Sequence, residues 1–167
     1  FFVIAAQNLG YQVTVLDPDQ KSPAGKVANK HICSSFSDQA ALDLMSKECM
    51  AISTEFENIP SETIKYLEQK VRTHPNSNAI SIVQRRVEEK KYIKELGIPI
   101  GSYEPLKSNQ FFLECKNTQI CPAILKQSQF GYDGKGQTHV NSINEVKAIF
   151  DNSKGKEFVL EKKLDLD

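Results

Sequence analysis

Residues 126–137, KQSQFGYDGKGQ, place three glycines between two short segments that have the composition of β-strands. The preceding segment is PAILK (122–126) and the following one is THV (138–140). A tight β-hairpin needs only one or two glycines. The stretch therefore predicts either an unusually glycine-rich hairpin or a strand–loop–strand flap that closes over a ligand, and its lysines favour an anionic ligand.

The spacing of Gly131, Gly134 and Gly136 excludes two common phosphate-binding motifs. A P-loop requires Ser or Thr after its lysine, but Lys135 is followed by glycine. A dinucleotide fingerprint has its glycines in the opposite order and opens a helix. The backbone N–H groups of a flap could still surround phosphate oxygens. Lys126 ends an apolar strand, where its charge needs an anion such as a nucleotide phosphate; a plain hairpin with a solvated lysine is the alternative.

Upstream of residue 75, segments typical of strands alternate with segments typical of helices, which predicts a parallel sheet flanked by helices. Ser37 is expected to cap the second predicted helix, and PDQKSPAG (18–25) is expected to be a loop. The predicted strands are YQVTVLD (11–17), HICSSF (31–36), MAIST (50–54) and VRT (71–73), and the predicted helices are FFVIAAQNLG (1–10), DQAALDLMSKE (38–48) and SETIKYLEQ (61–69).

The pattern changes near residue 75, so we predict one domain over residues 1–74 and a second, mixed α+β domain over residues 75–167. Asn76 is expected to cap a continuous helical run that ends at Gly97. Further strands are predicted over IGSYE (100–104), PAILK, THV and EFVLE (157–161), with helices over SNQFFLEC (108–115) and INEVKAIF (143–150).

Composition limits the classes of partner. The 21 basic and 21 acidic residues cancel, which argues against bulk electrostatic binding to nucleic acid or to a membrane. The four cysteines and three histidines lack metal-ligand spacing, and free thiols fit a cytoplasmic protein. The opening FFVIAA is too short to span a membrane. Because the first residues resemble the middle of an element, we expect a fragment truncated at both ends.

Four segments in order resemble the ATP-grasp superfamily, and more closely the N5-carboxyaminoimidazole ribonucleotide synthetase family. They are TVLDPDQKSPAGKVANKHI (14–32), TEFENIP (54–60), RRVEEKKYIKELGIP (85–99) and FGYDGKGQ (130–137). The resemblance implies an α/β fold: a Rossmann-like, preATP-grasp parallel-sheet domain lacking its first strand, followed by part of an α+β ATP-grasp domain.

The resemblance also implies an activity. Enzymes of this family are ATP-dependent carbon–nitrogen ligases of purine biosynthesis that carboxylate aminoimidazole ribonucleotide with bicarbonate through carboxyphosphate. ATP and Mg²⁺ are the implied cofactors. No metal ligand or catalytic residue is assigned within the chain; the metal ligands are expected beyond residue 167, so the fragment alone is expected to be inactive. A homodimer is compatible with the resemblance. An ATP-grasp ligase acting on glycinamide ribonucleotide or biotin, and a non-catalytic nucleotide-binding module, are the alternatives.

The resemblance assigns site residues by position. Glu57 is the candidate for contacting the imidazole nucleotide, with a solvated strand end as the alternative. Asp17 ends a strand as a ribose-binding acid would in an NAD-binding protein, a rival that Pro18 weakens. The implied ATP-binding residues are Arg86, Lys126, Gly131, Tyr132, Asp133, Gly134, Lys135, Gly136, Gln137, Glu161, Lys162, Lys163 and Leu164.

Overall fold

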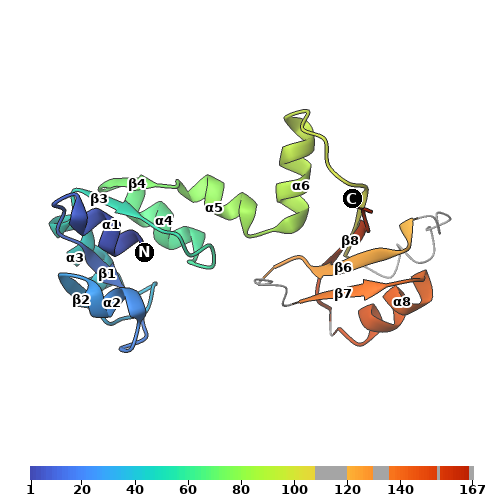
Figure 1. The fold of residues 1–167 in the computed structure, drawn as a ribbon, viewed down its shortest axis with the longest axis horizontal. Helices are drawn as coiled ribbons and strands as arrows, with labels where there is room; N and C mark the ends of the chain where they lie inside the picture. Colours follow the sequence, from blue (N-terminus) through green and yellow to red (C-terminus); the bar gives the residue numbers. More distant parts are fainter. Residues whose placement is uncertain (108–119, 130–135, 154, 166–167) are drawn as a thin grey trace. The chain divides into compact units, whose positions relative to one another are not determined.

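The computed structural model describes residues 1–107, 120–129, 136–153 and 155–165 (Figure 1). The chain divides into two compact units, Phe1–Ser81 and Ile82–Asp167. Each unit has a hydrophobic core of its own. No helix within the described ranges has the length and apolar character needed to cross a membrane.

The first unit is built from parallel strand pairs and helices. β1 pairs with β2, and β3 pairs with β4, in parallel in both cases, which confirms the predicted parallel arrangement. In the described residues the strands form two separate two-stranded sheets rather than one. The elements are α1 (Phe2–Asn8), β1 (Thr14–Leu16), α2 (Pro23–Val27), β2 (Lys30–Ile32), α3 (Gln39–Glu48), β3 (Ala51–Ser53), α4 (Ser61–Glu68) and β4 (Arg72–His74).

Helices α3 and α4 of this unit are joined by apolar and by polar contacts. Leu42 and Met45 of α3 and Leu67 of α4 belong to the same buried cluster. Beside it, Asp43 accepts hydrogen bonds from Lys70 Nζ at 2.7 Å and from the Tyr66 hydroxyl. The bond from Lys70, followed by that from Tyr66, lowers the pKa of Asp43 to about 2. The carboxylate is therefore stabilised in its charged form by its partners on and after α4.

Two local predictions for this unit are wrong. The cap of α3 is Asp38, not Ser37: its Oδ1 accepts from the N–H groups of Ala40 at 2.9 Å and Ala41 at 3.4 Å. A carboxylate is favoured there because it also meets the positive end of the helix dipole. The expected loop at 18–25 contains the start of α2, because Ser22 caps this short helix and Pro23 has the backbone angle that a first helical residue needs.

The second unit contains an antiparallel sheet in the order β5–β8–β6–β7, so its predicted mixed α+β character is confirmed. α8 covers one face of this sheet (Figure 1). Its buried Val146 and Phe150 belong to the same core cluster as Leu125 and Leu160. The elements are α6 (Arg86–Glu95), β5 (Tyr103–Leu106), β6 (Ala123–Gln127), β7 (Gln137–Val140), α8 (Ile143–Asp151) and β8 (Phe158–Lys162); the predicted helix over 108–115 lies outside the described residues.

The predicted continuous helix between Asn76 and Gly97 is interrupted. Its two ends are as expected, because the Asn76 side chain accepts from Ala79 N–H at 2.8 Å and Gly97 has a φ of 74°. In between, α5 (Ser77–Val83) ends and Arg85 is extended, with φ −121° and ψ 100°. The N–H of Arg86 donates to the carbonyl of Ser128 at 3.0 Å. A tertiary hydrogen bond thus replaces a helical one at the start of α6.

Candidate functional site

The face of the antiparallel sheet opposite α8 carries the predicted polar residues. Alternate residues of a strand point to opposite faces, so Lys126 and the buried Leu125 point in opposite directions. The register pairs Glu161 with both Ile124 and Tyr103, and Lys126 with Val159. Lys126, Glu161 and Tyr103 consequently share one face.

Glu161 lies between two lysines on this face. Its Oε2 atom is 2.9 Å from Lys126 Nζ and 3.2 Å from Lys90 Nζ. The side chains are largely shielded, with exposed fractions of 21% for Lys126, 17% for Lys90 and 17% for Glu161. The Lys90 ammonium also lies 5.4 Å from the centre of the Tyr103 ring. Helix α6 thus contributes a cation to the face of the sheet.

This cluster of Lys90, Lys126 and Glu161 has a net positive charge, because two ammonium groups face one carboxylate. Arg86 lies four residues before Lys90, which puts it on the same side of α6. A shielded surplus of positive charge attracts anions more strongly than exposed lysines do, because solvent screens it less. The anion beside Lys126 is the carboxylate of Glu161, so its burial is offset without a phosphate. A phosphate contact of Lys126 stays a prediction.

The glycine-rich stretch connects β6 to β7, which pair antiparallel, so its predicted position between two strands is confirmed. This pairing is common to a plain hairpin and to a flap that closes over a ligand. Gln127 N–H donates to the carbonyl of Gly136 at 2.8 Å, and Gln137 pairs with Lys126. Gly136 has a φ of 75°, and a Cβ there would lie 3.3 Å from Gln127 Cδ. The loop therefore leaves the sheet directly beside Lys126. Five predicted site residues lie outside the described residues: Gly131, Tyr132, Asp133, Gly134 and Lys135.

The segment after Glu161 is held by its backbone. Lys162 N–H donates to Ser102 O at 2.9 Å, and Lys163 N–H donates to Pro122 O at 3.0 Å. Leu164 follows with 55% of its surface exposed. These two bonds anchor the strand end next to the Lys90–Glu161–Lys126 cluster.

Glu57 is an exposed residue of the first unit. Glu57 does not lie in an extended strand end, because β3 ends at Ser53 and the chain then turns. The Thr54 hydroxyl, which donates to Phe56 O at 3.0 Å and accepts from its N–H at 3.1 Å, fixes this turn. A contact between Glu57 and a nucleotide stays a prediction.

Asp17 holds its own loop together. One carboxylate oxygen accepts from Asp19 N–H at 2.8 Å and the other from the Ser22 hydroxyl at 2.9 Å. Such bonds are typical of an aspartate that shapes a turn. The geometry gives the NAD-binding alternative no support, since both oxygens already have partners.

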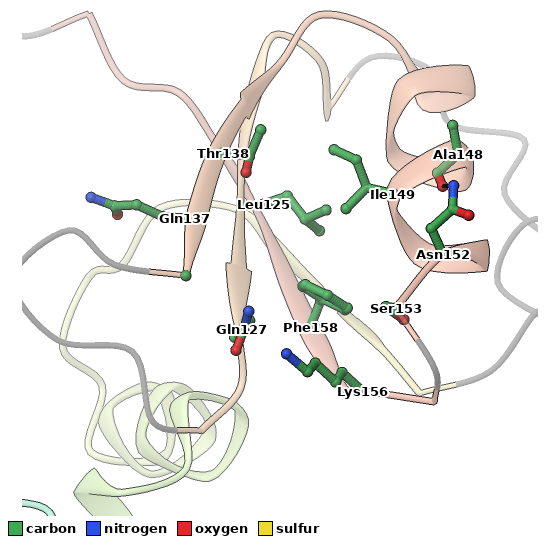
Figure 2. A pocket seen from close by; sticks show the side chains of 11 residues that line it. Leu125, Gln127, Gln137, Thr138, Ala148, Ile149, Asn152, Ser153, Lys156 and Phe158 are labelled. Carbon is green, nitrogen blue, oxygen red and sulfur yellow. Dashed lines mark hydrogen bonds between the residues drawn. The ribbon is translucent and has the colours of Figure 1, made fainter.

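A pocket of about 550 Å³ lies between the sheet and α8 (Figure 2). Leu125, Gln127 and Phe158 line it from the strands, and Ile149 and Asn152 line it from the helix. Because Leu125 and Gln127 alternate with Lys126, this pocket opens on the face opposite the cluster. Its lining is apolar and polar, with Lys156 as the charged residue. It includes Gly136 and Gln137 of the predicted ATP-binding residues, but none of the predicted charged ones.

Lys90 of the cluster and the neighbouring Tyr103 were missed by the sequence prediction. The position of Lys90 one turn after Arg86 was the available signal. As for metals, no group of three or more His, Cys, Asp or Glu side chains suited to hold an ion occurs among the residues that the structure places.

Comparison with known proteins gives the same two-part organisation. Residues 1–84 match the model of the ribonucleotide synthetase preATP-grasp domain, and residues 91–167 match that of the ATP-grasp domain. N5-carboxyaminoimidazole ribonucleotide synthase of Staphylococcus aureus (strain COL) is 33% identical over 162 residues, which are 97% of this chain and 43% of that protein.

Solved structures are similar in fold as well. N5-carboxyaminoimidazole synthetase from Staphylococcus aureus, complexed with ADP, has a TM-score of 0.89 and 32% identity, covering 99% of this chain and 44% of that one. The enzyme from Aspergillus clavatus, complexed with ATP, has a TM-score of 0.82 and 26% identity, covering 97% and 43%. The chain thus spans less than half the length of these relatives. It belongs to the ribonucleotide synthetase family of ATP-grasp proteins, with a preATP-grasp domain followed by ATP-grasp sequence.

Proposed function

We propose that the protein containing this chain is an ATP-dependent ligase that carboxylates aminoimidazole ribonucleotide with bicarbonate. ATP would activate bicarbonate as carboxyphosphate, which then reacts with the amine of the ribonucleotide. The observation that carries the proposal is the similarity to N5-carboxyaminoimidazole ribonucleotide synthase over nearly the whole chain, together with a shielded cationic cluster where the glycine hairpin leaves the sheet.

The cluster supports nucleotide binding through its charge. If a phosphate reached Lys126, the lysine would replace its contact with the Glu161 carboxylate by a contact with a more highly charged anion. The hairpin from Lys126 to Gln137 would lie over the phosphates, and closure would exclude water from a labile intermediate. Arg86 would add a further cation from α6, and the segment Glu161–Leu164 would lie along the nucleoside.

Mg²⁺ is expected to accompany ATP, since phosphoryl transfer needs the charge of the transferred group neutralised. The described residues do not offer a carboxylate cluster for it, so no step is assigned to a metal on this chain. We further propose a cytoplasmic protein whose partners are small molecules, with neither nucleic acid nor membrane involved, and with Glu57 contacting the imidazole nucleotide.

The test uses the full-length protein with ATP, Mg²⁺, labelled bicarbonate and aminoimidazole ribonucleotide. We expect ADP release that depends on the ribonucleotide, and transfer of label into the nucleotide fraction. Glycinamide ribonucleotide and biotin are the control acceptors. Stimulation by one of these instead would identify another ligase of the superfamily, and nucleotide binding without any turnover would identify a binding module.

A further inference from the structure

We propose that Lys90 is a positioning residue that keeps the Glu161 carboxylate neutralised and oriented when Lys126 moves to a nucleotide phosphate. The inference rests on the proposed function, because it concerns the same nucleotide site. Lys90 enters from α6, whereas Lys126 and Glu161 belong to neighbouring strands.

The geometry supplies the first step. Lys126 Nζ and Lys90 Nζ approach the same oxygen of Glu161, at 2.9 Å and 3.2 Å. One carboxylate charge cannot neutralise two ammonium groups, and two like charges near one atom repel each other. Lys126 makes the shorter contact, but repulsion from Lys90 lowers the cost of releasing it when a phosphate competes for it, provided that Lys90 stays.

Burial supplies the second step. Glu161 is only 17% exposed, so leaving it without a cation would carry a large desolvation cost. Lys90 removes that cost, because the Lys90–Glu161 pair is neutral by itself. Lys90 is also only 17% exposed and lies 5.4 Å from the Tyr103 ring centre, which restricts where its ammonium can go.

Orientation supplies the third step. The ion-pair contacts of both lysines are with Oε2 of Glu161. With Oε2 retained by Lys90, Oε1 keeps a fixed direction and can accept a hydrogen bond from the nucleoside part of the ligand. Lys90 thus acts on the nucleoside through Glu161 and on the phosphates through the release of Lys126.

The experiment measures binding of ADP and of pyrophosphate to the full-length protein by calorimetry, for wild type, Lys90→Met and Lys90→Arg. Lys91→Met is the matched control, because Lys91 is the adjacent, 65% exposed lysine that pairs with Glu95 within α6. We expect Lys90→Met to weaken ADP binding by about tenfold, the effect of losing one charge-assisted contact. The binding of pyrophosphate, which has no nucleoside, should be weakened less by this substitution. Lys90→Arg should restore ADP binding, and Lys91→Met should leave it unchanged.

A double-variant cycle isolates the role of Glu161. In the Glu161→Gln background, Lys90→Met should change ADP affinity little, because the charge that Lys90 offsets is gone. Equal weakening of ADP and pyrophosphate would mean that Lys90 contributes only general positive charge, and unchanged ADP affinity in a folded Lys90→Met would also overturn the inference. If wild type itself bound no ADP, the proposed function would fail instead.

Discussion

At the scale of single residues, Lys126 is held by a carboxylate of its own chain, and under the proposed function a nucleotide phosphate would have to compete with that carboxylate. The contact with Glu161 is 2.9 Å long and partly shielded. It therefore keeps the ammonium in place before a ligand arrives. A preorganised cation loses less conformational freedom on binding than a solvated lysine does.

Lys126→Ala in the full-length protein should weaken ADP binding. A charge-assisted hydrogen bond contributes about 1.5–3 kcal/mol, which corresponds to roughly a tenfold to hundredfold loss of affinity. Calorimetric titration with ADP measures this loss. Lys147→Ala, which removes an exposed lysine from α8, is the control, and equal affinities in the two variants would remove Lys126 from the site.

Asp43 should make stability depend on pH at the contact between α3 and α4. Its folded pKa of about 2 lies below the ordinary value of 3.8. A carboxylate whose pKa is lowered in the folded state stabilises the fold at pH values above its unfolded pKa. This contribution is lost as the pH falls from 3.8 towards 2. Wild type should therefore be more stable than Asp43→Asn at pH 6, and the difference should shrink over that acidic range.

Urea unfolding of both proteins at pH 6, 4 and 2.5 provides the measurement. Asp38 and Glu68 also have lowered pKa values, caused chiefly by hydrogen bonds from Ser34 and Ser77, so both proteins lose stability in acid. Only the difference between them reports on Asp43. A difference that stays constant with pH would contradict this assignment.

At the scale of elements, the start of α6 lacks a side-chain cap. Arg85 has the extended backbone of a cap residue but makes no capping hydrogen bond. Arg85→Ser would create the sequence Ser–Arg–Val–Glu, a capping box in which Glu88 is the reciprocal partner. We expect the unfolding free energy to rise by about 1 kcal/mol, measured by chemical denaturation. Arg85→Ala is the control, and equal stability of the two variants would contradict the prediction.

The elements also show what sequence could and could not predict. Alternating strands, apolar helical spacing and the glycines at 10 and 97 locate most elements, because these signals are local. The break before Arg86 carries no proline or glycine, and the Arg86 N–H bonds instead to the carbonyl of Ser128, far along the chain. Lys90 was missed for the same reason: its partner Glu161 is brought to it only by the fold. The periodicity of apolar residues was enough to predict α3 and α4 in their order. The cluster of Lys90, Lys126 and Glu161 could not be predicted in this way, because it forms only in the tertiary structure.

At the scale of the whole molecule, each unit has a separate core. Leu67 belongs to the cluster of the first unit and Leu160 to that of the second. Leu67→Ala should destabilise residues 1–81, and Leu160→Ala residues 82–167, by about 2–5 kcal/mol in each case. Hydrogen exchange read separately over the two ranges measures this, each variant serving as the control for the other. Loss of protection over the whole chain in both variants would indicate a single cooperative unit.

The backbone bonds after Glu161 bear on which purine the protein would accept. The amides of Lys162 and Lys163 already donate to carbonyls of their own unit, and an N–H group used in this way cannot also donate to a nucleobase. A base lying along this segment would therefore gain no hydrogen bond from these two amides. Any discrimination between adenine and guanine would have to come from other groups, because a fixed strand end cannot turn these donors towards the ligand.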